Sequence, residues 1–352
     1  MLKVCKFGGT SMADGTCFAR VKAIVESDLS RRVIVVSAGG KRHADDYKMT
    51  DALYLCHAHL QYGFSCRRIW EKVRGRILRI RDELQLQTPV ERELDAIYAS
   101  FGPETPQDWL VCRGEYLTAL LMAEYLGYTF VDAVEWLRFD ENGCICTEAS
   151  YAALQDLADG HSIVTPGFYG RMPDGSVRTF SRGGSDITGS LAAAALRADL
   201  CENWTDVPGI LEADPQIVPE AGTIDRLHFE QLARLTEAGM QVLHESAVEP
   251  LRERNIPLRI CSTFQPELPG TRISNNPQDR NLREVVGFAG RRAEGRLLVL
   301  CTAAAAECIR CAVSRAGVLP VSDRYERGML ELTVPPAQYA QALAAAYGAA
   351  KK

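Results

Sequence analysis

Short apolar runs alternate with longer amphipathic stretches along most of this chain of 352 residues. Mostly apolar runs at 2–7, 33–36 and 163–166 predict strands, and such runs are typical of a parallel sheet covered on both faces. Apolar residues at helical spacing predict a helix over 17–26 and a long helical stretch over 51–100. Strands that alternate with helices indicate an α/β fold.

The same pattern continues through the middle of the chain. We expect a third strand-to-helix unit over 108–128 and a fourth strand over 130–137. Farther along, the pattern predicts in order a tight turn, a glycine-rich loop, an alanine-rich helix and a strand, at 172–176, 181–185, 190–196 and 200–204. The predicted fold class is therefore a three-layer αβα sandwich with a mostly parallel sheet.

A polar segment, SNNPQDRN at 274–281, predicts a linker between two domains. We place a large α/β domain at 1–274, the linker at 275–284 and a small α+β module at 285–352. In this module the pattern predicts a strand, a helix, two strands and a final helix, at 296–301, 303–316, 318–323, 329–334 and 338–347.

The composition argues against some classes of function. With 40 basic and 45 acidic side chains, the formal net charge is −5. Nucleic-acid and anionic membrane surfaces both need a concentrated basic face, so neither partner is expected. The first strand begins without a leader-like pattern, and no stretch approaches the roughly 20 apolar residues of a membrane span. We therefore expect a soluble, cytoplasmic protein.

Twelve cysteines lie scattered through mainly apolar segments. Without a secretion signal, most of them are expected to be reduced thiols of the core. Cys308 and Cys311 form a C-x-x-C pair, and Cys144 and Cys146 form a C-x-C pair. A structural zinc site normally needs four converging ligands, and neither pair has a second pair at the right spacing. No metal-ligating residues are therefore predicted.

Lys6 stands in the middle of the first strand, between Cys5 and Phe7. A charge there costs free energy unless a partner balances it. The first strand runs into the glycine-rich segment 8–11 and the second into 37–40, so two such turns should meet at one sheet edge. No P-loop or dinucleotide-binding motif is present. We interpret this edge as a phosphate site served by Lys6. The alternative is a lysine at a sheet edge whose glycines only turn the chain.

Three later segments carry further candidate chemistry. In FSRGGSDITG, Arg182 suits a carboxylate and Asp186 an ammonium group, although Asp186 could simply cap a helix. In CRGEYLTA, Glu115 at a helix start could serve the helix dipole or a cationic substrate group. Thr205 and Asp206 end a strand and precede turns that could hold a nucleotide, although turn propensity explains most of that segment.

The motifs K-F-G-G-T-S, V-S-A-G-G, R-G-E, R-G-G-S-D, T-D-V-P-G-I and A-D-P occur in this order from Leu2 to about Ile273. In that order they resemble the aspartate kinases of the amino acid kinase family. The resemblance implies phosphorylation of the β-carboxylate of L-aspartate to 4-phospho-L-aspartate, with ATP and Mg²⁺ as cofactors. This reaction leads toward lysine, threonine and methionine. The residues from 285 onward suffice for one ACT-like module, where many relatives have two. Such modules commonly pair, so a homodimer is expected.

The resemblance also implies roles for individual residues. Lys6 and Asp186 would be catalytic, with Lys6 at the transferring phosphoryl group. Glu115 would bind the α-ammonium group and Arg182 the α-carboxylate of the substrate. The other residues on the substrate side would be Ser37, Thr50, Gly183, Gly184 and Ser185. The nucleotide side would comprise Lys6, Gly8, Gly9, Ser11, Thr205, Asp206 and Asp214.

Two departures from the family pattern lie on the nucleotide side, at Gln216 and Gln241. Two other functions stay open, of which the second is motivated by these two glutamines and the short C-terminal part. One is a related kinase of acetylglutamate, glutamate or carbamate, although R-G-E and R-G-G-S-D together favour an α-amino acid. The other is a regulatory protein that binds an amino acid or a nucleotide without turnover.

Overall fold

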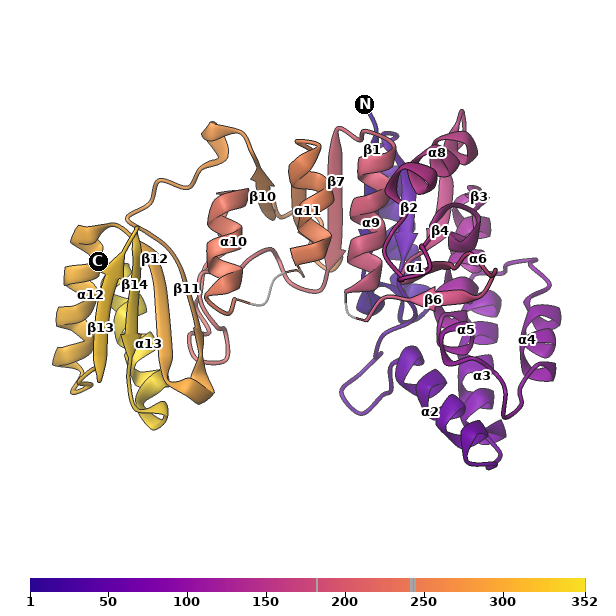
Figure 1. Cartoon of the computed structure of the whole chain (residues 1–352), viewed down its shortest axis with the longest axis horizontal. Coiled ribbons are helices and arrows are strands. Elements are labelled where there is room, and N and C mark those ends of the chain that lie inside the picture. Colours follow the sequence, from indigo (N-terminus) through magenta and orange to yellow (C-terminus); the bar gives the residue numbers. More distant parts are fainter. Residues whose placement is uncertain (182, 241–242, 244, 352) are drawn as a thin grey trace. The chain divides into compact units, whose positions relative to one another are not determined.

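The computed structural model describes residues 1–181, 183–240, 243 and 245–351. The chain divides into two compact units (Figure 1). The first comprises Met1–Asp206 and Ser246–Pro266, and the second comprises Val207–Glu245 and Glu267–Lys352. The domain borders expected from the sequence, at 274 and 285, were placed from sequence motifs, whereas these two units are defined by contacts in the structure. The expected borders therefore stay a prediction.

The first unit is built on six parallel strands. Their spatial order is β3, β4, β2, β1, β7 and β9, and each neighbouring pair is parallel. The strands are β1 (Lys3–Phe7), β2 (Arg31–Val36), β3 (Thr129–Phe130), β4 (Ile163–Pro166), β7 (Leu200–Thr205) and β9 (Leu258–Ser262). A separate antiparallel hairpin consists of β5 (Tyr169–Arg171) and β6 (Val177–Thr179) around the turn predicted at 172–176.

Helices cover both faces of this sheet, because successive side chains of a strand point to opposite sides. Phe7 of β1 and Ile34 of β2 share one apolar core with α1, α3 and α6. α9 contacts β1, β2 and β7 and lies next to α8 on the other face (Figure 1). The helices are α1 (Gly15–Glu26), α2 (Met49–Gln61), α3 (Arg67–Glu83), α4 (Val90–Ala99), α5 (Gln107–Val111), α6 (Arg113–Leu126), α7 (Ala133–Trp136), α8 (Thr147–Ala158), α9 (Gly184–Ala195) and α11 (Glu245–Glu253).

Two predicted elements are wrong in type. Residues 108–111 belong to helix α5 rather than to a strand, and Pro106 at the N-cap with Asp108 in the first turn favours a helix there. The segment 130–137 is not one strand, because β3 ends at Phe130 and α7 begins at Ala133. A capping box starts α7: the Asp132 side chain accepts from the backbone, and Glu135 accepts from the amide of Asp132.

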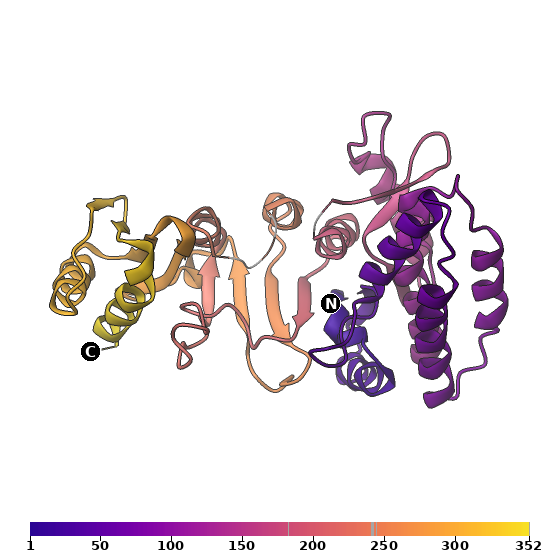
Figure 2. The same cartoon turned by 90° about the horizontal axis from the view of Figure 1, so that it is seen from below.

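The second unit combines a pair of parallel strands with an antiparallel sheet. β8 (Arg226–His228) pairs with β10 (Thr271–Ser274), and α10 (Phe229–Glu237) lies between them in sequence. The antiparallel sheet has the order β11, β12, β14, β13, formed by Val285–Arg291, Arg296–Cys301, Met329–Thr333 and Ser322–Glu326. Helices α12 (Ala303–Arg315) and α13 (Tyr339–Ala350) lie side by side and share one apolar core with this sheet (Figure 2).

The predicted fold class is confirmed, since a parallel sheet with helices on both faces is joined to a small α+β part that is consistent with an ACT-like region. The predicted strand 296–301 and both C-terminal helices are present, whereas β11 was not predicted. Short 3₁₀ helices complete the chain at Gly9–Met12, Pro277–Asp279, Arg292–Glu294 and Pro336–Gln338. Within the described residues, no helix is both long and apolar enough to span a bilayer.

Candidate active site

Lys6 lies in β1 with β2 on one side and β7 on the other, and it is 8% exposed. Its ammonium nitrogen lies 2.6 Å from Oδ1 of Asp186, in the first turn of α9. Helix α9 can approach this closely because it carries Gly189, where a Cβ would lie 3.0 Å from the Cβ of Lys6. The partner that a mid-strand lysine needs is therefore a carboxylate from a distant part of the chain.

The two glycine-rich turns predicted at one sheet edge do meet. The amide of Gly40 donates a 2.7 Å hydrogen bond to the carbonyl of Gly9, and a Cβ on Gly40 would lie 2.6 Å from the Gly9 carbonyl carbon. Gly8 lies beside Lys6, since a Cβ there would be 3.6 Å from the lysine nitrogen. Backbone amides can therefore come close to a ligand at this edge without obstruction by side chains.

Glu115 lies in the first turn of α6 and is 4% exposed. Its carboxylate is hydrogen-bonded to the backbone of Ala38 in the second turn, while Oε2 is buried without a hydrogen-bond partner among the described residues. Burial raises the pKa of Glu115 to about 8, and the hydrogen bond from Ala38 and the charge of Arg113 oppose this only in part. Gly114 permits the contact, because a Cβ there would lie 2.8 Å from the Cβ of Ala38. A carboxylate in such a place is stabilised either by binding a proton or by contact with a cationic group of a ligand.

Ser37 and Thr50, both half-buried, stand at the two ends of the segment between β2 and the first turn of α2. Arg76 of α3 holds this segment in place. Its guanidinium donates to the carbonyls of Gly39 at 3.3 Å and Gly40 at 2.8 Å, and it forms an ion pair with Asp46. Arg76 is 3% exposed, so a buried cation joins the second glycine-rich turn to the helical layer.

The N-terminus of α9 carries the other substrate-side residues predicted from the sequence. Gly183 caps the helix with φ of 59°, a conformation that favours glycine. A Cβ on Gly184 would lie 2.7 Å from the ring of Phe168, and Ser185 is buried. α9 begins here rather than at residue 190, which puts Asp186 within its first turn. Arg182 lies outside the described residues.

Three residues predicted for the nucleotide side lie at neighbouring strand ends of the first unit. The Ser11 hydroxyl is fully buried and shares a 2.7 Å hydrogen bond with Thr263, which follows β9. Thr205 ends β7, and its hydroxyl donates to the exposed carboxylate of Asp206 at 3.2 Å. The amide of Thr263 donates to the carbonyl of Thr205 at 2.8 Å, so this group joins the ends of β7 and β9.

Asp214 belongs to the second unit and is exposed. Its Oδ1 accepts a 2.9 Å hydrogen bond from the amide of Gln216, and its carbonyl accepts from Ile217 and Val218. In this structure Asp214 therefore folds its own turn, as the turn propensity of the segment suggested. Gln216 is also exposed, and Gln241 lies outside the described residues.

Sequence reasoning missed two buried residues that contact predicted ones. Arg76 is hidden in a helix rich in basic residues, and only its burial separates it from half-buried or exposed neighbours such as Arg74 and Lys72. Asn203 lies opposite Lys6 in the pairing of β7 with β1, and its amide contacts Asp186. An asparagine inside an otherwise buried strand was the available signal for the second residue.

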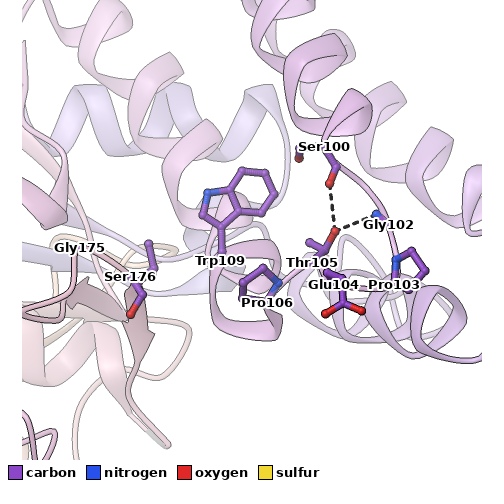
Figure 3. A pocket seen from close by; sticks show the side chains of 10 residues that line it. Ser100, Gly102, Pro103, Glu104, Thr105, Pro106, Trp109, Gly175 and Ser176 are labelled. Atoms are coloured by element: carbon purple, nitrogen blue, oxygen red, sulfur yellow. Dashed lines mark hydrogen bonds between the residues drawn. The ribbon is translucent and has the colours of Figure 1, made fainter.

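A surface hollow of about 530 Å³ lies elsewhere in the first unit, between the α4–α5 connection and the β5–β6 turn (Figure 3). Trp109, Pro106 and Val177 give it a largely apolar lining. Thr105 stabilises its rim, because its hydroxyl donates to the carbonyl of Ser100 at 3.0 Å and accepts from the amide of Gly102 at 2.8 Å. The residues that line this hollow are not among those predicted for the active site.

The chain resembles known aspartokinases over most of its length. It is 37% identical to aspartokinase 3 of Bacillus subtilis over 304 residues, which cover 82% of this chain and 66% of the relative. Its matches to aspartokinases from Pseudomonas aeruginosa and Escherichia coli cover 51% and 65% of those proteins. The chain therefore spans about half to two thirds of the length of the curated relatives it matches.

Solved structures show the same fold. A crystal structure of aspartate kinase from Clostridium acetobutylicum superposes with a TM-score of 0.89 at 30% identity, covering 99% of both chains. Escherichia coli aspartokinase III, solved with aspartate and ADP, gives a TM-score of 0.72 at 26% identity over 95% of this chain and 78% of that one. Residues 1–262 match the model of the amino acid kinase family. With its parallel sheet, its paired glycine-rich turns and this match over most of its length, the chain belongs to the amino acid kinase family.

Proposed function

We propose that this chain is an aspartate kinase, which transfers the γ-phosphoryl group of ATP to the β-carboxylate of L-aspartate and forms 4-phospho-L-aspartate. The observation that carries the proposal is Glu115, a buried carboxylate with one oxygen free of hydrogen-bond partners within the described chain. An α-ammonium group would complete it. Acetylglutamate and carbamate lack a free α-ammonium group, so Glu115 favours an unmodified amino acid over both.

The phosphoryl side is proposed at the edge formed by Lys6 and the two glycine-rich turns. Lys6 would neutralise charge on the γ-phosphoryl group, and the backbone of Gly8 and Gly9 would approach the phosphates closely. No group of three or more metal-ligating side chains occurs among the residues that the structure describes. We therefore propose that Mg²⁺ enters with the ATP phosphates, where it would offset their negative charge.

The chemistry asks for alignment rather than for a general base. A carboxylate is already a competent nucleophile, so the protein must bring two anions together and hold them in line. Lys6 would supply positive charge where the phosphoryl group moves, while Glu115 would hold the far end of the aspartate. Closure over the site would protect the acyl phosphate from water.

The remaining roles follow the family resemblance and are part of the same proposal. Ser37 and Thr50 would face the β-carboxylate, and Arg182 the α-carboxylate, with Gly183, Gly184 and Ser185 around them. Ser11, Thr205, Asp206 and Asp214 would line the nucleotide site. We also propose a catalytic domain at 1–274, a linker at 275–284 and an ACT-like module at 285–352 through which two copies pair. The enzyme would act in the cytoplasm and supply aspartyl phosphate for lysine, threonine and methionine.

Trapping of the product tests the proposal. The purified chain is incubated with Mg-ATP, L-aspartate and hydroxylamine, which converts an acyl phosphate into a stable hydroxamate. We expect hydroxamate with aspartate and none with acetylglutamate or glutamate. If hydroxamate formed with glutamate or acetylglutamate instead, the proposed substrate would be wrong, while the proposed phosphoryl transfer to a carboxylate would stand. Nucleotide or amino-acid binding without product would identify a regulatory protein.

A further inference from the structure

Asn203 is a buried polar residue next to the catalytic pair, and it has no role in the site described so far. It lies on β7, directly opposite Lys6 in the pairing of β7 with β1, and is 7% exposed. Its Nδ2 donates a 3.0 Å hydrogen bond to Oδ1 of Asp186. The ammonium group of Lys6 contacts the same oxygen at 2.6 Å. One carboxylate oxygen therefore receives both a charged and a neutral donor.

Asp186 determines which way the Asn203 amide faces. An ionised carboxylate only accepts hydrogen bonds, so the NH₂ group must point toward it and the carbonyl oxygen away. That oxygen, Oδ1 of Asn203, is buried and has no partner in the described part of the chain. Buried amides that serve packing alone normally have both ends paired, because an unpaired end is costly. An amide with one end on Asp186 and the other open is better suited to a site that ligands complete.

We propose that Asn203 is a positioning residue for phosphoryl transfer, which holds the Asp186 carboxylate in the orientation that the Lys6–Asp186 pair requires. This inference rests on the proposed function. Lys6 must be available to phosphate oxygens while Asp186 stays in place, and a second donor on Asp186 keeps the carboxylate from rotating when the lysine shifts. The substitution of Asn203 should then act on turnover more than on substrate binding.

The titratable groups around this amide are few. Lys6 faces it from β1 and Asp186 faces it from α9. Cys201 lies two residues earlier on β7, on the same face of the strand. On the β9 side its register partner is Ile260, which is apolar. A carboxylate placed at position 203 would therefore meet one anion and one cation directly.

Two variants of the full chain test the proposal, with wild type assayed alongside for aspartate-dependent hydroxamate. Asn203→Leu replaces the amide by an apolar side chain of similar size and so removes the donor. We expect kcat to fall about 10- to 100-fold with little change in either KM, as for loss of a hydrogen bond to a charged group. Asn203→Asp places a second carboxylate beside Asp186. When the two carboxyl groups share one proton, the protonated group at position 203 can donate a hydrogen bond to Asp186, as the amide does in wild type. Protonation becomes more frequent as the pH falls, so the activity of this variant relative to wild type should rise.

A merely structural role predicts something else. Both variants would then lose stability, and their activities relative to wild type would stay constant with pH. Asn281→Leu serves as the control for damage to the fold, because Asn281 is also 7% exposed but lies in the second unit. A wild-type kcat for Asn203→Leu, or a flat pH ratio for Asn203→Asp, overturns the inference while the proposed function stands. A wild-type chain without turnover overturns both.

Discussion

The ammonium nitrogen of Lys6 lies 2.6 Å from Oδ1 of Asp186, and this pair joins the middle of the sheet to the first turn of α9. The side chain of Lys6 is 10% exposed and that of Asp186 is 21% exposed. A carboxylate next to a cation that is this buried offsets part of the free-energy cost of removing the charge from water. Phosphate oxygens that reach the edge of the sheet would compete for the same ammonium group.

Replacement of Lys6 by methionine should abolish most turnover. Methionine keeps much of the stem that packs against Gly189 but removes the charge, and we expect kcat to fall about 10²- to 10³-fold, as for loss of one donor to transition-state charge. The KM for aspartate should change far less. Hydroxamate formation measures both constants, and thermal unfolding checks the fold. Unchanged turnover in Lys6→Met would remove this residue from the mechanism.

The substitution Glu115→Gln should stabilise the protein at high pH. Burial raises the pKa of Glu115 from 4.5 to about 8, so the native chain retains a proton that the unfolded chain loses between those values. Wild-type stability therefore falls as the pH rises through this window, whereas glutamine has no proton to lose. The variant should gain up to about 5 kcal/mol relative to wild type by pH 8, the free-energy equivalent of that pKa difference.

Urea unfolding at several pH values measures this gain. Glu104→Gln is the matched control, because Glu104 is exposed and the same change of charge there should leave the pH dependence close to that of wild type. The Glu115 variant should also bind aspartate weakly, since a neutral amide balances an ammonium group poorly. If the stabilities of wild type and Glu115→Gln changed in parallel with pH, this would contradict a buried Glu115 carboxylate with a raised pKa.

A methyl group at position 189 should damage the site without damaging the fold. In Gly189→Ala the new Cβ would lie 3.0 Å from the Cβ of Lys6, so strand and helix must separate by a few tenths of an ångström. Turnover should fall, while the higher helix propensity of alanine offsets part of the strain, by about 1 kcal/mol. Gly348→Ala, at an exposed helical glycine with nothing within 4 Å, should raise stability and leave turnover unchanged. Equal turnover in both variants would show that Lys6 tolerates displacement.

Loss of Arg76 should destabilise the protein and loosen the segment between Ser37 and Thr50. Arg76→Met removes the buried partner of Asp46, which is 7% exposed, while Arg42 keeps its 2.8 Å ion pair with that carboxylate. The loss should therefore be smaller than the roughly 3–5 kcal/mol of a buried charge left without any partner, but larger than about 1 kcal/mol. The KM for aspartate should rise with it. Arg74→Met, on the same helix but paired with an exposed Asp95, should cost less than about 1 kcal/mol. Comparable losses in the two variants, measured by urea unfolding, would show that Arg76 does not anchor this segment.

The pattern of apolar runs was sufficient for most of the architecture. The predicted strands that begin near residues 2, 33, 163, 200 and 296 appear close to their predicted positions, because a short, mostly apolar run between turns can bury its side chains and pair its backbone groups inside a sheet. Local competition explains the errors. At 130–137 a capping box, Asp132 with Glu135, starts a helix within a run whose composition favours a strand.

The sequence by itself determined the glycine-rich turns, the lysine that needs a partner and the order of motifs that marks the family. Only the tertiary structure decided that the partner of Lys6 is Asp186, that Asn203 contacts the same oxygen and that Glu115 is buried. Periodicity reports which face of an element is covered, because it depends on neighbours three or four residues away. The order of strands in a sheet decides which distant side chains meet, and the register of β1 with β7 brings Lys6 beside Asn203.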